Sequence, residues 1–153
     1  MLGARVIVTP NASRTSPDDF RNVVKRLAAE NGCFDTDQFA NFANVQAHRD
    51  TTAREILAAL PDVRAFVAGA GTGGTLTGVG QVLTERDSTI RIVLADPEGS
   101  GLADWVRTGT LGPDGAYAVE GIGPSSPSCP IPGIGTARNL GWRVGEGACT
   151  LTR

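Results

Sequence analysis

The chain has 153 residues, of which 41% are hydrophobic and 20% charged, a balance typical of one soluble globular domain or a piece of a larger one. Its formal net charge of -2 provides no basic field for nucleic acid or an anionic membrane, and no apolar run approaches the roughly 20 residues that cross a bilayer. Because the chain shows neither a signal-peptide pattern nor a Cys-x-x-Cys pair, we expect a cytoplasmic protein without metal, nucleic-acid or membrane partners.

The N-terminal part predicts a strand, a helix and a second short strand. Residues 5–9 form a β-branched run that Pro10 stops. Ser16 before Pro17 has the form of a helix N-cap, and Asn31-Gly32 has the form of a helix end. The expected apolar face consists of Phe20, Val23, Val24, Leu27 and Ala28. The pair Cys33-Phe34 predicts another strand, with Cys33 as a small core residue.

The middle of the chain predicts a parallel βαβ unit. Thr52 and Glu55 have the spacing of a capping box, which indicates a helix that ends before Pro61. Strands over 64–68 and 90–95 flank a helix over 74–86. Parallel strands under helices bind ligands at the carboxyl ends of their strands.

The remaining residues are less regular. We expect a short helix over 100–107 and a strand over 117–119. From Pro124 onward the sequence is rich in turn-forming residues and has no period of 2 or 3.6, so residues 124–153 predict an irregular, poorly ordered tail.

The loop Gly71-Thr-Gly-Gly-Thr75 predicts a phosphate site. Glycine permits positive φ and close approach of a ligand to the main chain, and the following helix presents free N–H groups and its positive dipole end. Thr72 and Thr75 add hydroxyl donors. A tight turn without a ligand is the simpler alternative.

The same loop also fits a dinucleotide fingerprint. Gly69, Gly71 and Gly74 match G-x-G-x-x-G after a strand, and Asp96 follows the next strand, where an acid would bind ribose hydroxyls. This gives a competing prediction of an NAD(P)-binding domain. A non-catalytic phosphate-binding remnant is a third reading.

Six motifs together favour a different family. They are LGARVIVTP at 2–10, QFANFAN at 38–44, HRDTT at 48–52, GTGGTLTG at 71–78, DPEGS at 96–100 and EGIG at 120–123. In this order and spacing they resemble cysteine synthase (O-acetylserine sulfhydrylase) and cystathionine β-synthase, which are fold-type-II pyridoxal-phosphate enzymes. The resemblance covers about residues 1–123 and corresponds to the central part of such enzymes.

The resemblance implies a cofactor site and a substrate loop. The cofactor is pyridoxal 5'-phosphate, whose phosphate would be held by Gly71, Thr72, Gly73, Gly74 and Thr75. Gly121 and Gly123 match a loop that approaches the cofactor ring, with a simple turn as the alternative. Gln38 and Phe39 match the loop that closes over the amino-acid substrate; without that motif context, a surface glutamine and a core phenylalanine are equally expected.

The residues that would perform the chemistry are not found in the chain. In the resembled enzymes a lysine forms a Schiff base with the cofactor, whereas the one lysine here, Lys25, lies on the polar side of the predicted first helix. We assign no catalytic residue. His48, the single histidine, lacks triad spacing and is expected to be structural.

We therefore expect an α/β fold, a three-layer and mostly parallel sheet flanked by helices, from an incomplete enzyme. Residues 1–44 would end a small mobile domain, and 45–123 would belong to a large cofactor domain. The complete enzyme would be a homodimeric transferase or lyase of cysteine biosynthesis that replaces the β-substituent of O-acetylserine or serine with a sulfur nucleophile. The fragment itself would be inactive.

Overall fold

The computed structural model describes residues 3–13, 15–110, 112, 121–122, 140–145 and 148–151. The chain forms two compact units, Met1–Asp37 and Gln38–Arg153. The division between Asp37 and Gln38 is closer to the N-terminus than the predicted domain boundary at residue 44. The assignment of the parts to a mobile and a cofactor-binding domain stays a prediction.

The described residues of the first unit form one helix, α1 (Phe20–Asn31). Its N-cap is Asp19, whose carboxylate accepts the Arg21 N–H at 3.0 Å and pairs with the Arg21 guanidinium at 2.7 Å. The prediction of Ser16 as N-cap is wrong, because the Ser16 hydroxyl accepts the Asp18 N–H in a turn before the helix. The predicted helix end is confirmed: Gly32 adopts the left-handed conformation with φ 62°.

The two strands predicted for this unit are not present. Val8 and Phe34 are 89% and 84% exposed, and neither segment belongs to a strand. A β-branched run alone does not make a strand, because an extended segment is stabilised only by a neighbouring ladder and a buried face. Cys33 is exposed and not a core residue as predicted. Lys25 on α1 is also exposed.

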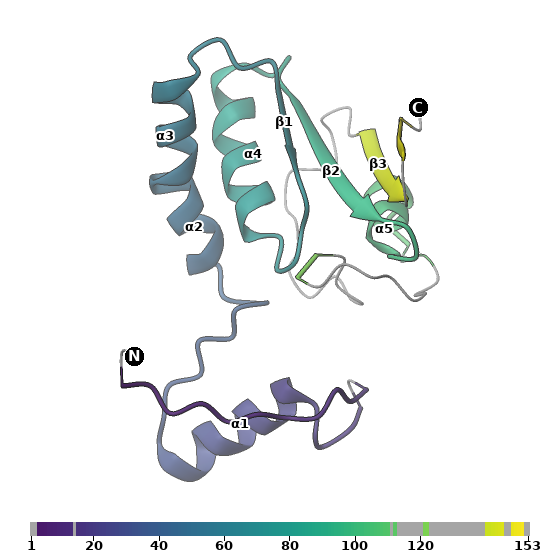
Figure 1. Ribbon diagram of the computed structural model, residues 1–153. Coiled ribbons are helices and arrows are strands. Elements are labelled where there is room, and N and C mark those ends of the chain that lie inside the picture. Colours follow the sequence, from purple (N-terminus) through teal and green to yellow (C-terminus); the bar gives the residue numbers. More distant parts are fainter. Residues whose placement is uncertain are drawn as a thin grey trace. The chain divides into compact units, whose positions relative to one another are not determined.

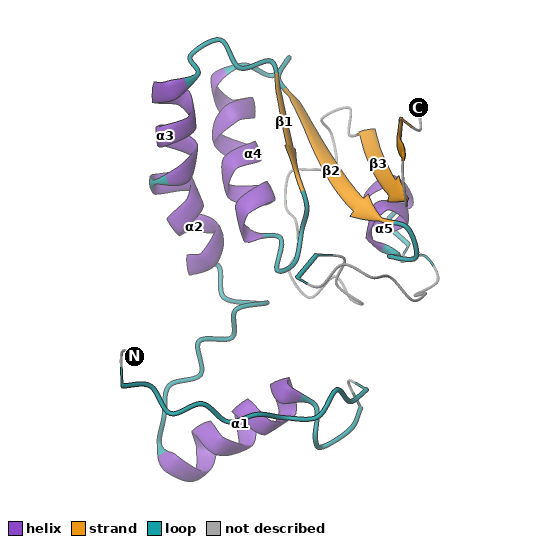
Figure 2. Cartoon of the chain, viewed as in Figure 1, coloured by secondary structure: helices purple, strands orange, loops and turns teal. Residues whose placement is uncertain are grey.

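The second unit is an α/β arrangement (Figures 1 and 2). Its elements are α2 (Ala43–Asp50), α3 (Thr52–Ala59), β1 (Ala65–Ala68), α4 (Gly74–Arg86), β2 (Arg91–Pro97), α5 (Leu102–Thr108), β3 (Leu140–Gly145) and β4 (Ala148–Leu151). The strand order is β1-β2-β3-β4. The first two pairings are parallel and the last is antiparallel. The predicted class, a mainly parallel sheet flanked by helices, is confirmed.

The predicted βαβ unit is also confirmed, and α4 has the predicted bounds. The predicted capping box before α3 is wrong: Thr51 is the N-cap and makes no side-chain capping bond.

Strands β3 and β4 lie in a region predicted to be irregular, and β3 is paired along β2. The predicted strand at 117–119 and the rest of the tail lie outside the described residues.

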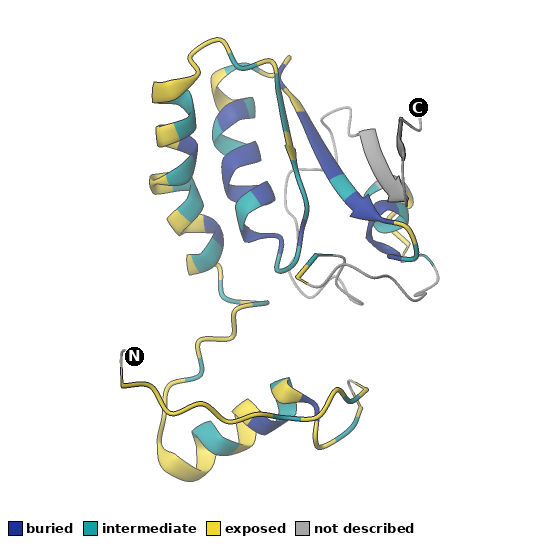
Figure 3. Cartoon of the chain, in the orientation of Figure 1, coloured by how far each residue is buried: buried dark blue, intermediate teal, exposed yellow. Residues whose placement is uncertain are grey.

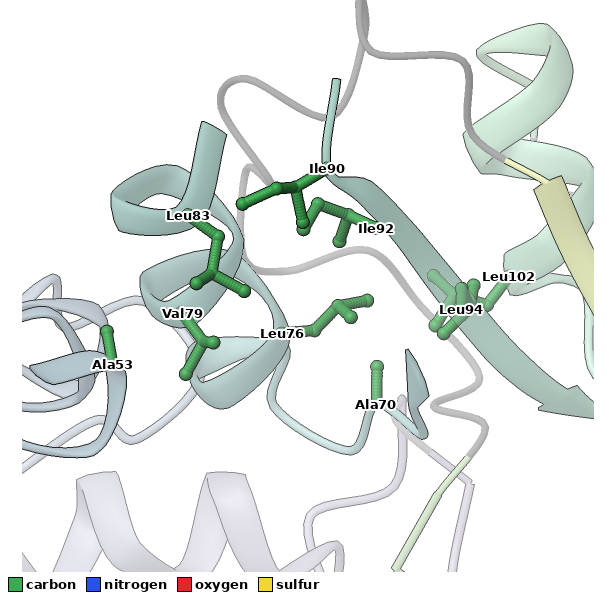
Figure 4. Packing of buried hydrophobic residues seen from close by; sticks show 9 residues of the cluster. All are labelled: Ala53, Ala70, Leu76, Val79, Leu83, Ile90, Ile92, Leu94 and Leu102. Carbon is green, nitrogen blue, oxygen red and sulfur yellow. The ribbon is translucent and has the colours of Figure 1, made fainter. Parts of the chain in front are cut away.

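The core lies between α4 and the sheet. Figure 4 shows Leu76, Val79 and Leu83 of α4 packed toward residues of β2. Ile92 and Leu94 on β2 are 4% and 3% exposed. Buried residues on β2 and α4 are dark blue in Figure 3. None of the helices in the described ranges combines the length and hydropathy that a bilayer crossing needs.

Candidate phosphate-binding site

The candidate site is the turn between the carboxyl end of β1 and the first turn of α4. Gly73 is the N-cap of α4 with φ 84° and makes no side-chain capping bond. That φ suits glycine, because a Cβ would be strained there. The amides of the first helical turn therefore have no side-chain carboxylate as a cap. Together with the positive end of the helix dipole they favour an anion.

A second loop closes one side of this turn. A Cβ at Gly69 would lie 2.7 Å from Cγ2 of Ile122, and a Cβ at Gly71 would overlap the carbonyl oxygen of Gly121. Gly121 itself has φ 85° and is exposed. The structure thus brings two predicted cofactor residues, Gly71 and Gly121, into contact. Gly123 lies outside the described residues.

Thr72 is held by α2. Its Oγ1 accepts a hydrogen bond from Nδ2 of Asn44 at 2.9 Å and a longer one from the Gly74 N–H at 3.4 Å. The Asn44 Nδ2 also donates to the carbonyl oxygen of Gln38 at 3.1 Å. Asn44 therefore connects the predicted substrate loop with the predicted phosphate loop.

Thr75 is held by the same helix one turn later. Its Oγ1 lies 3.0 Å from Nε2 of His48, and Nδ1 of His48 lies 3.0 Å from Oγ1 of Thr52. The imidazole is thus fixed at both nitrogens by hydroxyl groups. These contacts are consistent with the expected structural role of His48, and the group that it supports is a predicted phosphate ligand.

Two glycines of α4 allow α2 to approach this closely. A Cβ at Gly74 would overlap Oδ1 of Asn44, and a Cβ at Gly78 would lie 2.5 Å from the Val45 carbonyl oxygen. Because residues four apart share one face of a helix, Asn44 and His48 both face the start of α4. Without side chains at the two glycines, both polar groups reach the threonine hydroxyls.

The predicted substrate residues, Gln38 and Phe39, are the first two residues of the second unit. Gln38 is exposed, and Phe39 is half-buried. The backbone of Gln38 is tied to the phosphate loop through Asn44. The substrate-binding role of Gln38 and Phe39 stays a prediction.

Asp96 does not fit the dinucleotide alternative. It is 1% exposed, and its Oδ2 accepts the Ala103 N–H at the start of α5 at 2.8 Å. A ribose-binding acid must be accessible from the phosphate loop. Its burial and its bond to Ala103 therefore disfavour Asp96 as a ribose ligand and favour a structural role at the start of α5.

Two supporting residues were not assigned to the site from the sequence. In the sequence, Asn44 is marked only as one residue of the motif at 38–44. His48 lacks the spacing of a catalytic triad. The sequence does contain one signal that could have identified them. Asn44 and His48 are four residues apart, and so are Gly74 and Gly78, so each pair lies on one face of its helix. That pairing becomes informative only once α2 and α4 are known to pack together.

A family model described as "Pyridoxal-phosphate dependent enzyme" matches residues 1–136. The chain belongs to this family. Among curated proteins, it is 45% identical over 121 residues to cysteine synthase 2 of Neurospora crassa, covering 72% of this chain and 26% of that protein. It is 43% identical over 130 residues to cystathionine beta-synthase of Saccharomyces cerevisiae, covering 80% and 25% respectively.

Solved structures of the family agree with the fold. O-ureido-L-serine synthase matches with a TM-score of 0.60 and 35% identity, over 74% of this chain and 34% of that one. The O-acetylserine-dependent cystathionine beta-synthase from Helicobacter pylori matches with a TM-score of 0.57 and 38% identity, over 65% and 31% respectively. The chain thus spans about a quarter to a third of the length of these relatives.

Proposed function

We propose that this chain carries the phosphate-binding part of a pyridoxal-phosphate enzyme that exchanges the β-substituent of an amino acid for a sulfur nucleophile. The observation that carries the proposal is the start of α4, where the N-cap is Gly73 and the hydroxyls of Thr72 and Thr75 are held beside it by α2. A phosphate dianion needs converging N–H and O–H donors, and this turn supplies both. The names of the relatives give the class of reaction.

The residues fit the cofactor's phosphate. Gly71, Thr72, Gly73, Gly74 and Thr75 would hold it, and Gly121 would lie beside the ring end of the site. The bound cofactor would withdraw electrons from the Cα of the amino acid. Gln38 would offer its uncharged amide to the substrate carboxylate, and Phe39 would exclude water above it.

The substrate proposed is O-acetylserine or serine. Both cysteine synthases and cystathionine beta-synthases are among the relatives, so the proposal includes sulfide and homocysteine as nucleophiles. A cytoplasmic homodimer is proposed for the complete enzyme. As given, the chain would bind the cofactor through its phosphate without turnover, since Lys25 is exposed on α1 and lacks the desolvated setting of a reactive lysine.

The test measures the equilibrium binding of pyridoxal 5'-phosphate and of pyridoxal to the full chain. The absorbance of the ligand reports how much is bound. We expect the phosphorylated form to bind at least about ten-fold more tightly, the equivalent of one charge-assisted hydrogen bond. Equal binding of the two forms would contradict the proposal. Binding of NADPH in place of pyridoxal 5'-phosphate would restore the dinucleotide reading.

A further inference from the structure

The amide of Asn44 has only one orientation that satisfies its neighbours. One neighbour of its Nδ2 is the carbonyl oxygen of Gln38 at 3.1 Å, and the other is Oγ1 of Thr72 at 2.9 Å. A backbone carbonyl can only accept a hydrogen bond, so the NH2 end of the amide must face it. The second amide hydrogen is then directed at Thr72, whose hydroxyl is the acceptor.

The hydroxyl of Thr72 therefore has only its hydrogen left to offer. A hydroxyl has two acceptor lone pairs and one hydrogen. One lone pair receives the Asn44 amide at 2.9 Å and the other receives the Gly74 N–H at 3.4 Å. The hydrogen can still be donated to an acceptor that is not among these groups. Such a hydroxyl suits a ligand whose exposed atoms are all acceptors, as in a phosphate dianion.

The position of Asn44 is as constrained as its orientation. It lies in the first turn of α2, and its Oδ1 occupies the space that a Cβ at Gly74 would need. The side chain is half-buried between the two loops. Asn44 thus touches the Gln38 backbone, Thr72 and Gly74 at once, so a single amide links residues 38 and 72.

We propose that Asn44 is a positioning residue that orients the Thr72 hydroxyl as a one-way donor to a phosphate group and couples this donor to the substrate loop at Gln38. The inference rests on the proposed function, because it needs a phosphate ligand at the start of α4. Asn44 acts through Thr72 and does not touch the ligand.

A double-mutant cycle tests this dependence. The affinity of the full chain for pyridoxal 5'-phosphate is measured for the wild type, Asn44→Ala, Thr72→Ala and the double variant. We expect Thr72→Ala to lose about ten-fold in affinity, the loss expected for a hydrogen bond to a charged group. Asn44→Ala should lose affinity by no more than that, because it acts through the same hydroxyl. The double variant should lose no more than Thr72→Ala alone. Additive losses would overturn the role of Asn44 while leaving the proposed function intact.

The control is Gln46→Ala on the same helix. Gln46 is exposed and donates to Asp50 at 3.0 Å, away from the phosphate loop. The Gln46→Ala variant should bind pyridoxal 5'-phosphate with the affinity of the wild type. A loss of affinity as large as that of Asn44→Ala would overturn the assignment to Asn44. Far-UV circular dichroism and urea unfolding establish that each variant is folded.

A second measurement needs no variant. Inorganic phosphate is added to the 15N-labelled wild type, and the side-chain NH2 signals of Asn44 are followed with the backbone amides of Gly73, Gly74 and Thr75. We expect the Asn44 signals to move together with these amides. Movement of the backbone amides alone would overturn the inference only. No movement of any of them would overturn both the inference and the proposed function.

Discussion

Gly78 of α4 lies directly against the backbone of Val45 on α2. A Cβ at Gly78 would come within 2.5 Å of the Val45 carbonyl oxygen and 2.8 Å of Cβ of His48. Val45 is fully buried there. The absence of a side chain at Gly78 therefore sets the separation of the two helices that bear the site.

The first prediction is that Gly78→Ala destabilises the chain although alanine is the better helix former. Propensity alone would add about 1 kcal/mol of stability. The overlap with a backbone oxygen instead forces α2 outward, at a cost of about 1–3 kcal/mol. Urea unfolding measures the difference. Gly80→Ala is the matched control, since its Cβ would meet the side chain of Ile92, nearest at 3.2 Å, and no backbone atom is among its three nearest neighbours. A more stable Gly78→Ala variant would contradict the packing described.

The second prediction concerns the contact between the loops. Gly71→Ala places its Cβ on the carbonyl oxygen of Gly121. Because this neighbour is backbone, the loop at 121–122 must move, and we expect weaker binding of pyridoxal 5'-phosphate. Binding of unphosphorylated pyridoxal, measured in parallel, reports on the ring end of the site. An unchanged affinity for both ligands would mean that the two loops are not coupled.

The third prediction concerns the tautomer of His48. If Thr75 donates its hydrogen to phosphate, Nε2 of His48 must donate to Thr75, and Nδ1 must accept from Thr52. We expect 15N chemical shifts of the ring to report hydrogen on Nε2, the nitrogen that faces Thr75. His48→Leu should lower phosphate affinity about ten-fold, and Thr52→Val should have a smaller effect. Hydrogen on Nδ1 alone would contradict this arrangement.

The fourth prediction concerns the core under the site. Leu83 is fully buried in the cluster between α4 and β2. Leu83→Ala should lower the free energy of unfolding by about 2–5 kcal/mol through lost burial and the cavity left behind. Thr84→Ala, one residue along the same helix, is the comparison, because Thr84 is only half-buried. Equal losses in the two variants would show that the cluster is not the stabilising core.

The fifth prediction is a pH effect. Hydrogen bonds from the Thr89 hydroxyl and N–H, at 2.7 and 2.8 Å, hold the pKa of Asp87 below its ordinary value. A lowered folded-state pKa contributes stability above the unfolded-state pKa, and that contribution is lost as the pH falls through the folded-state value. Thr89→Val should raise the pKa of Asp87, as followed by carboxyl 13C titration. An unchanged titration would show that the hydroxyl bond is not formed in solution.

The βαβ unit could be predicted because its signals are local and agree with one another. An apolar run, a glycine turn and a periodic apolar helix are all contiguous in the sequence. The N-terminal strand could not be predicted in the same way, because a strand depends on a partner and residues 5–9 have none among the described residues. Cys33 was misplaced for a similar reason, since its burial depended on that strand.

The glycine turn before α4 could be predicted from glycine and threonine spacing, and its role in binding phosphate stays a prediction. The residues that support this turn could not be predicted. The hydrogen bond from Asn44 to Thr72 spans 28 residues, and the contact of His48 with Thr75 spans 27. Such pairs become visible only when the crossing of α2 over α4 is known. The same holds for Asp96, whose role at the α5 terminus follows from burial and not from its spacing to the glycines.

The most direct test of the phosphate site is an amide titration of the 15N-labelled chain with pyridoxal 5'-phosphate. We predict that the largest shifts occur at Gly71, Thr72, Gly73, Gly74, Thr75 and Gly121. No shift within residues 71–75 would contradict the assignment of the start of α4 as the cofactor phosphate site.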